Sequence, residues 1–258
     1  MSMKINKNHL FLLLSVSLVF FSSCSDSLSD TTDGRLRYWI STLASDEFEG
    51  RAPGTEGGKL TKNFISKTFQ DLSLDPVNGE YLHKVPASEI TLKDSSYLTL
   101  SFRGNDRKMI TGQEVVFWTK QAREYRKIRD SEVVFVGYGI VAPEYNWNDY
   151  EGIDVKGKTV VMLVNDPGFA TGKLRLFNGR SMTYYGRWTY KFEEAARQGA
   201  AAAIIVHEEE PAAYPWSVVE NSWQGPQLDL QREDLGADRV ILEGWIRDIT
   251  LDEVLNFT

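Results

Sequence analysis

The 258-residue sequence has few of the residues that most often build catalytic or redox centres. Its single cysteine, Cys24, excludes an internal disulfide. Its three histidines, at positions 9, 83 and 207, are far apart in the chain. No cluster of basic residues offsets the net charge of −7, which argues against a nucleic-acid partner.

The familiar motifs of catalytic sites are absent or incomplete. A His-Glu-x-x-His zinc motif starting at His207 would need a histidine where Pro211 stands. Residues 137–139 read Gly-Tyr-Gly without the third glycine of a dinucleotide-binding loop, and no Gly-x-Ser-x-Gly motif occurs. We interpret His207 as the solvent-facing end of a strand, and the oxygen-bearing residues 146–154 as a solvated turn.

The N-terminus has the pattern of a secretion signal. Lys4 and Lys7 precede a twelve-residue apolar stretch, residues 10–21, which is too short to span a bilayer. Small residues then precede Cys24, as in bacterial lipoprotein signals, where the cysteine carries the lipid. We expect a signal peptide over residues 1–23, then lipidated Cys24 and a flexible tether up to residue 34. The protein would then be exported and anchored to a bacterial membrane, at the outer membrane, in the periplasm or on the cell surface. An ordinary cleaved signal with an incidental cysteine is the alternative.

Apolar periodicity predicts an α+β fold in which helices come first and strands dominate afterwards. Helices with one buried face are predicted over residues 35–43, 59–72 and 183–199. Strands are predicted over residues 115–119, 132–141, 158–164, 200–206 and 239–246. A hairpin is predicted from residues 90–92 and 97–102, and Pro211 and Pro215 argue against regular structure after the strand 200–206. Thr250 and Glu253 form a capping box that predicts the start of a last helix, which favours a truncated product, and a short terminal helix that docks on the domain is the alternative.

An aromatic segment, residues 177–190, holds five aromatic residues and two arginines. Flat rings beside a cation are well suited to contact a peptide. We therefore name five possible substrate contacts: Arg180, Tyr184, Tyr185, Arg187 and Trp188. The alternative is an aromatic loop that packs on its own domain.

Several segments together resemble one protein family. Residues 44–58, 135–154, 156–169 and 176–223 resemble the exported bacterial aminopeptidases that use two zinc ions, in the superfamily of glutamate carboxypeptidase II and the transferrin receptor. The resemblance implies that residues 35–87 are the N-terminal helical segment of an incomplete α/β zinc-peptidase domain. It implies a mostly β protease-associated domain, with flanking helices, over residues 88–246, and the start of the return to the peptidase domain over residues 247–258.

The family's metal ligands have no counterpart in this sequence. They comprise a His-x-Asp motif, a bridging aspartate, a Glu-Glu pair, a further acid and a last histidine, all after the inserted domain. His207 and Glu208 fall inside the inserted domain, and Glu209 is not an aspartate. We therefore expect no catalytic residue and no zinc ligand on this chain, although the full-length family binds two zinc ions.

The resemblance favours the N-terminal part of a membrane-tethered zinc aminopeptidase, truncated within its last helix and inactive as given. Its protease-associated domain would contribute access or binding for peptide or protein substrates. The alternative is a non-catalytic lipoprotein that uses this domain as a peptide- or protein-binding module.

Overall fold

The computed structural model describes residues 32–255, which belong to two compact units with a boundary between Lys84 and Val85. The predicted signal peptide, Cys24 and most of the predicted tether lie outside the described residues. The last tether residues, 32–34, are wrongly predicted, because they form the first turn of a helix. Each unit is described by itself.

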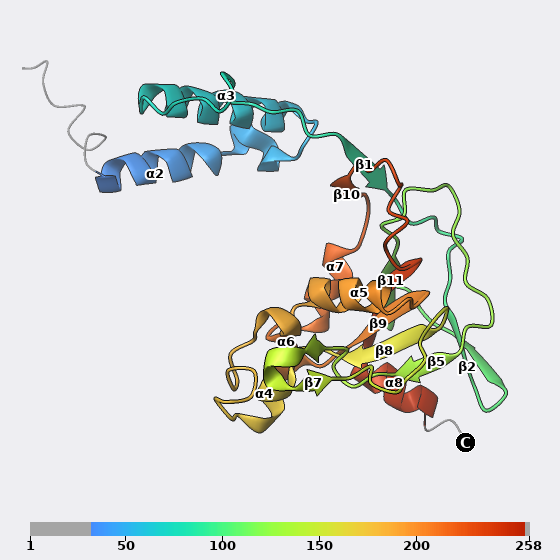
Figure 1. The fold of residues 1–258 in the computed structure, drawn as a ribbon. Coiled ribbons are helices and arrows are strands. Elements are labelled where there is room, and N and C mark those ends of the chain that lie inside the picture. The colour runs from blue at the N-terminus through green and yellow to red at the C-terminus, as the bar shows by residue number, and fades with distance from the viewer. Residues whose placement is uncertain (1–31, 256–258) are drawn as a thin grey trace, which may run out of the picture. The chain divides into compact units, whose positions relative to one another are not determined.

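The N-terminal unit contains α2 (Thr32–Leu43), a 3₁₀ helix η1 (Asp46–Arg51) and α3 (Glu56–Asp71) (Figure 1). Both predicted helices are confirmed. The α3 helix begins earlier than expected, because the Thr55 side chain caps it by accepting a 3.1 Å hydrogen bond from the Gly58 N–H. Phe48 of η1 is buried and meets the ring of Phe64 edge to face at 6.0 Å.

The C-terminal unit is built on a five-stranded sheet in the order β4-β11-β9-β8-β5. The strands are β4 (Val115–Trp118), β5 (Val133–Phe135), β8 (Thr159–Leu163), β9 (Ala202–His207) and β11 (Leu242–Arg247). The edge strand β4 is antiparallel to β11, and the other neighbouring pairs are parallel. The strands predicted in these five places are therefore confirmed.

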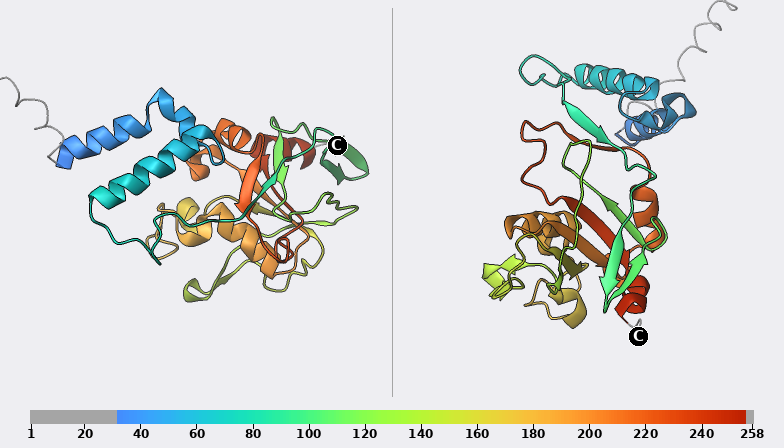
Figure 2. Two further views of the ribbon diagram at one scale, coloured as in Figure 1. Left: turned by 90° about the horizontal axis from the view of Figure 1, so that it is seen from above. Right: turned by 90° about the vertical axis from the view of Figure 1, so that its right-hand side faces the viewer.

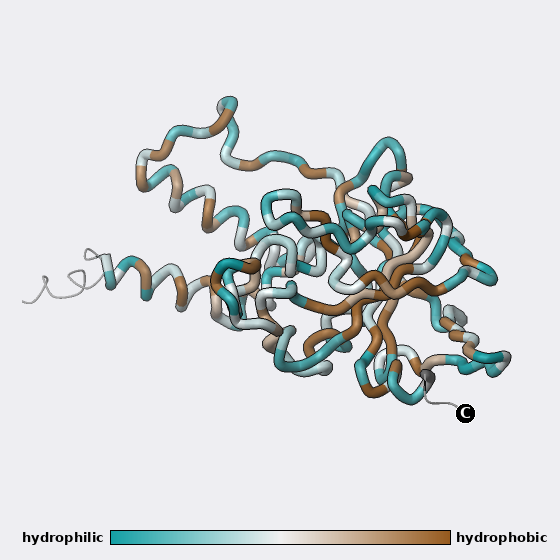
Figure 3. Tube along the Cα trace, turned by 60° about the horizontal axis from the view of Figure 1, so that its bottom comes forward, coloured by the Kyte–Doolittle hydropathy of each residue, from teal (hydrophilic) through white to brown (hydrophobic). Residues whose placement is uncertain are grey.

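The core strands carry apolar side chains on both faces, because alternate residues of a strand point to opposite sides. One face, with Met162 and Ile205, packs against α5 (Trp188–Arg197) and α7 (Trp216–Ser222). The other face, with Ile204 and Val206, packs against the hairpin of β2 (Thr99–Phe102) and β3 (Asn105–Lys108) and against α8 (Asp248–Leu255). Figure 1 shows α5 and α8 on opposite sides of the sheet, and the hydropathy trace in Figure 3 shows how apolar these strands are.

Short elements complete the C-terminal unit (Figure 2). Two further small sheets pair β1 (Ala87–Ile90) with β10 (Gln227–Leu230), and β6 (Val141–Ala142) with β7 (Trp147–Asn148). The remaining helical turns are η2 (Pro143–Tyr145), α4 (Pro167–Thr171), η3 (Tyr184–Gly186) and α6 (Glu209–Ala212). The architecture is α+β, as predicted.

One predicted hairpin, and the extent of one predicted strand, differ from the structure. The hairpin of residues 90–92 and 97–102 is wrong: β1 pairs with β10, and β2 turns back onto β3 through Arg103 and Gly104. Both turn residues have positive φ, 50° and 82°, as a two-residue hairpin turn requires. The strand predicted over residues 132–141 stops at Phe135, because Gly137 and Gly139 adopt φ of 56° and 65° and break the extended backbone.

The helices near the prolines and at the C-terminus also differ from the predictions. Pro211 lies in the first turn of α6 and Pro215 precedes α7, both places where a missing N–H costs no helical hydrogen bond. The predicted capping box is wrong, because α8 already begins at Asp248 and Thr250 is a buried residue inside it. The helix predicted from residue 183 begins at Trp188, after the separate turn η3.

Candidate functional site

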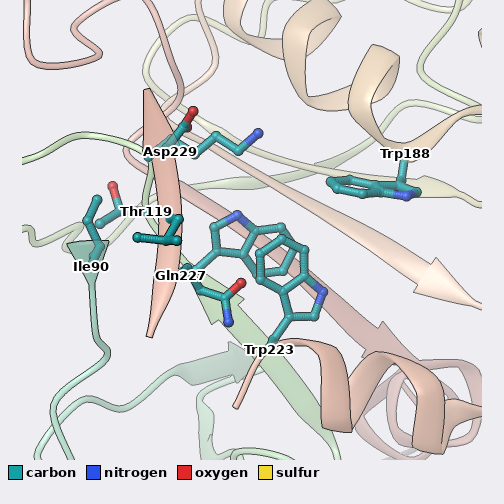
Figure 4. A pocket seen from close by; sticks show the side chains of 9 residues that line it. Ile90, Thr119, Trp188, Trp223, Gln227 and Asp229 are labelled. Atoms are coloured by element: carbon teal, nitrogen blue, oxygen red, sulfur yellow. The ribbon is translucent and has the colours of Figure 1, made fainter. Parts of the chain in front are cut away.

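Three tryptophans from distant parts of the sequence line a pocket in the C-terminal unit (Figure 4). Trp118 ends β4, Trp188 begins α5 and Trp223 follows α7. The pocket has a volume of about 180 Å³. Its other lining residues are Ile90, Thr119, Lys120, Gln227, Leu228 and Asp229.

The indole rings hold one another in fixed orientations. Trp118 and Trp223 stack with their centroids 3.3 Å apart and their planes 6° from parallel. Trp188 meets Trp223 edge to face at 5.7 Å and 86°. Trp118 is anchored from behind, because its indole N–H donates a 2.9 Å hydrogen bond to Oε2 of the buried Glu243. The rings therefore form a rigid aromatic corner.

A lysine and a glutamate lie beside the tryptophan rings. The Lys120 Nζ lies 6.0 Å from the Trp188 ring centroid and 4.0 Å from Oε2 of Glu243. Burial raises the pKa of Glu243, and the positive charge of Lys120 opposes that rise. Gln227 and Asp229 alternate on β10 and therefore share one face of that strand.

The predicted substrate-contact residues are divided among several places rather than forming one patch. Trp188 belongs to the tryptophan pocket. Tyr184 is 62% exposed and its ring lies 6.1 Å from that of Tyr185. The Tyr185 hydroxyl donates a 2.6 Å hydrogen bond to Glu144 Oε1, which raises the pKa of Tyr185 to about 12 and lowers the pKa of Glu144.

The two arginines of that set are exposed. Arg180 pairs with Glu210 at 2.5 Å and its guanidinium lies 4.4 Å from the centroid of the Phe169 ring. Arg187 connects η3 to α5. Beneath them Phe177 is completely buried and stacks on Tyr145, so part of the aromatic segment packs on its own domain.

His207 does not face solvent, which corrects the sequence-based interpretation. It is only 2% exposed, and the rings of Tyr214, Trp216 and Trp245 surround it with centroids 5.5 to 5.9 Å away. Burial lowers its pKa, and its Nε2 has no hydrogen-bond partner within the described residues. An apolar, ring-lined environment favours a neutral imidazole.

Lys191 is a second buried ionisable group at this end of the sheet. Its Nζ donates a 2.5 Å hydrogen bond to the Tyr138 carbonyl oxygen. Asp149, predicted to lie in a solvated turn, instead accepts hydrogen bonds from the N–H groups of Tyr138 and Ile140 at 3.2 and 3.0 Å. These contacts hold the loop that follows β5, which is a structural role.

No zinc site can be assembled from the part of the chain that the structure describes. Residues 32–255 contain no group of three or more His, Cys, Asp or Glu side chains placed to hold a metal ion. His207 offers one free nitrogen, but aromatic rings and not further ligands surround it. The parallel strands lie side by side in chain order: β5, β8, β9 and β11. The sheet therefore has no point at which the strand order reverses, which is where open α/β sheets usually bind ligands.

Within residues 32–255, no helix has both the length and the apolar content to cross a membrane.

The substrate contacts predicted from the sequence do not include four other residues of the pocket: Trp118, Lys120, Trp223 and Asp229. No spacing in the chain predicts that they meet, because β4, α7 and β10 are distant in sequence and belong to different parts of the fold.

No protein-family model and no curated protein matches the sequence. Among solved structures, an aminopeptidase from Aneurinibacillus sp. strain AM-1 is 17% identical with a TM-score of 0.35, and the match covers 83% of this chain and 40% of that one. The zinc aminopeptidase BSAP from Bacillus subtilis is 19% identical with a TM-score of 0.28, covering 80% of this chain and 42% of that one. The chain thus spans about 40% of the length of these proteins. Values this low assign no activity, substrate or metal to this chain.

Proposed function

We propose that this chain supplies the N-terminal helices and a substrate-access domain to a zinc-dependent aminopeptidase. The support is the resemblance of residues 44–58, 135–154, 156–169 and 176–223 to that family. The zinc ions and the catalytic groups would be held by a peptidase domain of which the N-terminal unit is the beginning. The C-terminal unit would border the path by which peptides reach that site.

The observation that carries the proposal is the exposed apolar surface of the N-terminal unit. Leu36 and Ile40 of α2 are 47% and 66% exposed, and Phe69 at the end of α3 is 40% exposed. Phe48 is the one hydrophobic residue of residues 32–84 that is buried. Helices that show apolar side chains on this scale need a further layer, and a sheet of the same domain is the usual one.

The binding module is the second candidate, and the tryptophan pocket is the observation that favours it. A small aromatic pocket with charged groups at its edge suits peptide recognition with or without catalysis. The resemblance of the four segments to the zinc aminopeptidases makes the peptidase the better supported of the two.

The DNA that follows codon 258 tests the proposal. We expect it to encode the His-x-Asp motif and the later acidic and histidine ligands, because the family carries them after the inserted domain. The product that includes that sequence should hydrolyse aminoacyl p-nitroanilides, lose the activity with 1,10-phenanthroline and regain it with zinc. The 258-residue chain alone should bind no stoichiometric zinc and cleave none of these substrates. The absence of a His-x-Asp motif from every downstream frame, or activity of the short chain, contradicts the proposal.

The same proposal places the protein at a bacterial membrane through a lipid on Cys24, a residue outside those that the structure describes. Buried acyl chains contribute about 0.8 kcal/mol per methylene, so several chains on one residue anchor stably. In the native host, Cys24→Ser should release the protein from the membrane fraction and abolish labelling with radioactive palmitate. A variant that stays labelled and membrane-bound rules out this anchor.

A further inference from the structure

The tryptophan pocket has the size of a site for a single side chain. Cofactor and drug-sized ligands occupy pockets of roughly 300 to 1,000 Å³. The volume here, about 180 Å³, is below that range. Trp188 and Trp223 are half-buried, so they leave part of their rings uncovered within the described residues. An aromatic side chain can add to these rings in the edge-to-face or offset geometry that aromatic pairs prefer.

Lys120 brings an unused donor to the edge of the pocket. Its ammonium carries three N–H donors but makes no hydrogen bond within the part of the chain that the structure describes. Its ion partner Glu243 is 4.0 Å away and already accepts the indole N–H of Trp118. The Lys120 side chain is 23% exposed, so an oxygen of a ligand can reach it.

Asp229 brings an unused acceptor to the same pocket. Its Oδ1 accepts a 2.8 Å hydrogen bond from the Leu230 N–H, whereas its Oδ2 accepts none within residues 32–255. Lys120 and Asp229 both line the pocket. Asp229 is labelled in Figure 4. Lys120 can donate a hydrogen bond to a peptide C=O group, and Asp229 can accept one from a peptide N–H group. A hydrocarbon ligand could form neither hydrogen bond.

We propose that the tryptophan pocket binds one aromatic side chain of a peptide, with Lys120 donating to the adjacent carbonyl or carboxylate oxygen and Asp229 accepting from a backbone N–H. The biological source of the peptide rests on the proposed function, since the peptide would be a substrate on its way to the zinc site or its product. The binding itself requires no zinc and no hydrolysis.

The test follows the indole N–H signals of the full chain by ¹H–¹⁵N NMR during titration with N-acetyl-L-phenylalaninamide. Saturable shifts should concentrate on Trp118, Trp188 and Trp223. N-acetyl-L-leucinamide should bind about two- to tenfold more weakly, because aromatic pairing adds roughly 0.5 to 1.5 kcal/mol beyond area burial. N-acetyl-L-phenylalanine, with a free carboxylate, separates the two oxygen sources: tighter binding than the amide points to a C-terminal residue, and equal or weaker binding to an internal one.

Two variants and a matched control connect the shifts to the pocket. Trp223→Ala should remove saturable binding, and Lys120→Gln should weaken it while reducing the difference between the acid and the amide. Trp147→Phe is the control, since Trp147 contacts Phe177 away from the pocket and its indole nitrogen has no hydrogen-bond partner within the described residues. If Trp223→Ala does not fold, Lys120→Gln and the shift pattern of the unaltered chain decide the question.

Failure here is distinguishable from failure of the proposed function. Absence of saturable shifts, shifts spread over all tryptophans, or equal affinity for the leucine and phenylalanine amides overturns the pocket proposal, even if the longer product proves to be a zinc aminopeptidase. Conversely, a pocket that binds the phenylalanine amide stands even if no downstream zinc motif exists.

Discussion

At the residue scale, Lys191 of α5 is a lysine whose side chain the fold buries completely. Loss of hydration is the main cause that lowers its pKa, to about 7, and the negative charges of Asp149 and Asp166 oppose this. The helix therefore carries a cation into the interior, where one carbonyl oxygen accepts its hydrogen bond.

Lys191 should give the C-terminal unit a stability that rises with pH. The pKa of lysine is about 10.4 in an unfolded chain and about 7 here, so between these values the unfolded state binds more protons. The free energy of unfolding from this group therefore increases as pH rises from 7 towards 10, by at most about 1.4 kcal/mol per pH unit, and is flat below 7. Urea unfolding of the native chain and of Lys191→Met, between pH 6 and 9, measures this slope.

Lys191→Met should lack the slope, because methionine does not titrate. Lys173→Met, at an exposed lysine of the same unit, is the matched control and should keep it. Equal slopes in the native chain and Lys191→Met would show that Lys191 keeps an ordinary pKa.

At the element scale, the sequence predicts best where burial alone determines the pattern. The apolar runs that became β8 and β9 are covered on both faces, so continuous hydrophobicity locates them. The strand prediction fails where a turn or a distant pairing partner determines the structure instead of the β-propensity of the residues. The run from residue 132 is cut at Phe135 by the two glycines that follow, and β1 leaves its sequence neighbours to pair with β10.

The candidate site was predictable only in part. The aromatic segment of the sequence predicts Trp188 as a contact, but Trp118 and Trp223 join it through tertiary contacts that no local pattern encodes. Pro215 predicts a break in regular structure, but in the fold it directly precedes α7, the helix that positions Trp223. The sequence predicts His207 at the end of a strand, as the structure confirms, but the burial of its ring depends on Trp216 of α7 and Trp245 of β11, whose positions come from the tertiary fold.

At the scale of the whole molecule, the two units differ in how complete their cores are. Every member of the three hydrophobic clusters lies between Leu98 and Leu251. In residues 32–84 the one buried hydrophobic residue is Phe48. Two short helices with so small a core are marginal by themselves, whereas a sheet covered on both faces can support its own cooperative unfolding.

We therefore predict that residues 85–258 fold without the residues before them. Thermal unfolding followed by near-ultraviolet circular dichroism should give a transition within a few degrees of that of residues 32–258, because the tryptophan and tyrosine cores are retained. Residues 32–84 alone should show weak helical signal and no cooperative transition.

The matched control deletes residues 239–258 instead, which removes β11 from between β4 and β9. This deletion should abolish folding, because Trp245 and Ile246 of β11 fill opposite faces of the sheet. A chain of residues 85–258 that is unfolded, or that melts far below the longer chain, would mean that the sheet depends on the N-terminal helices.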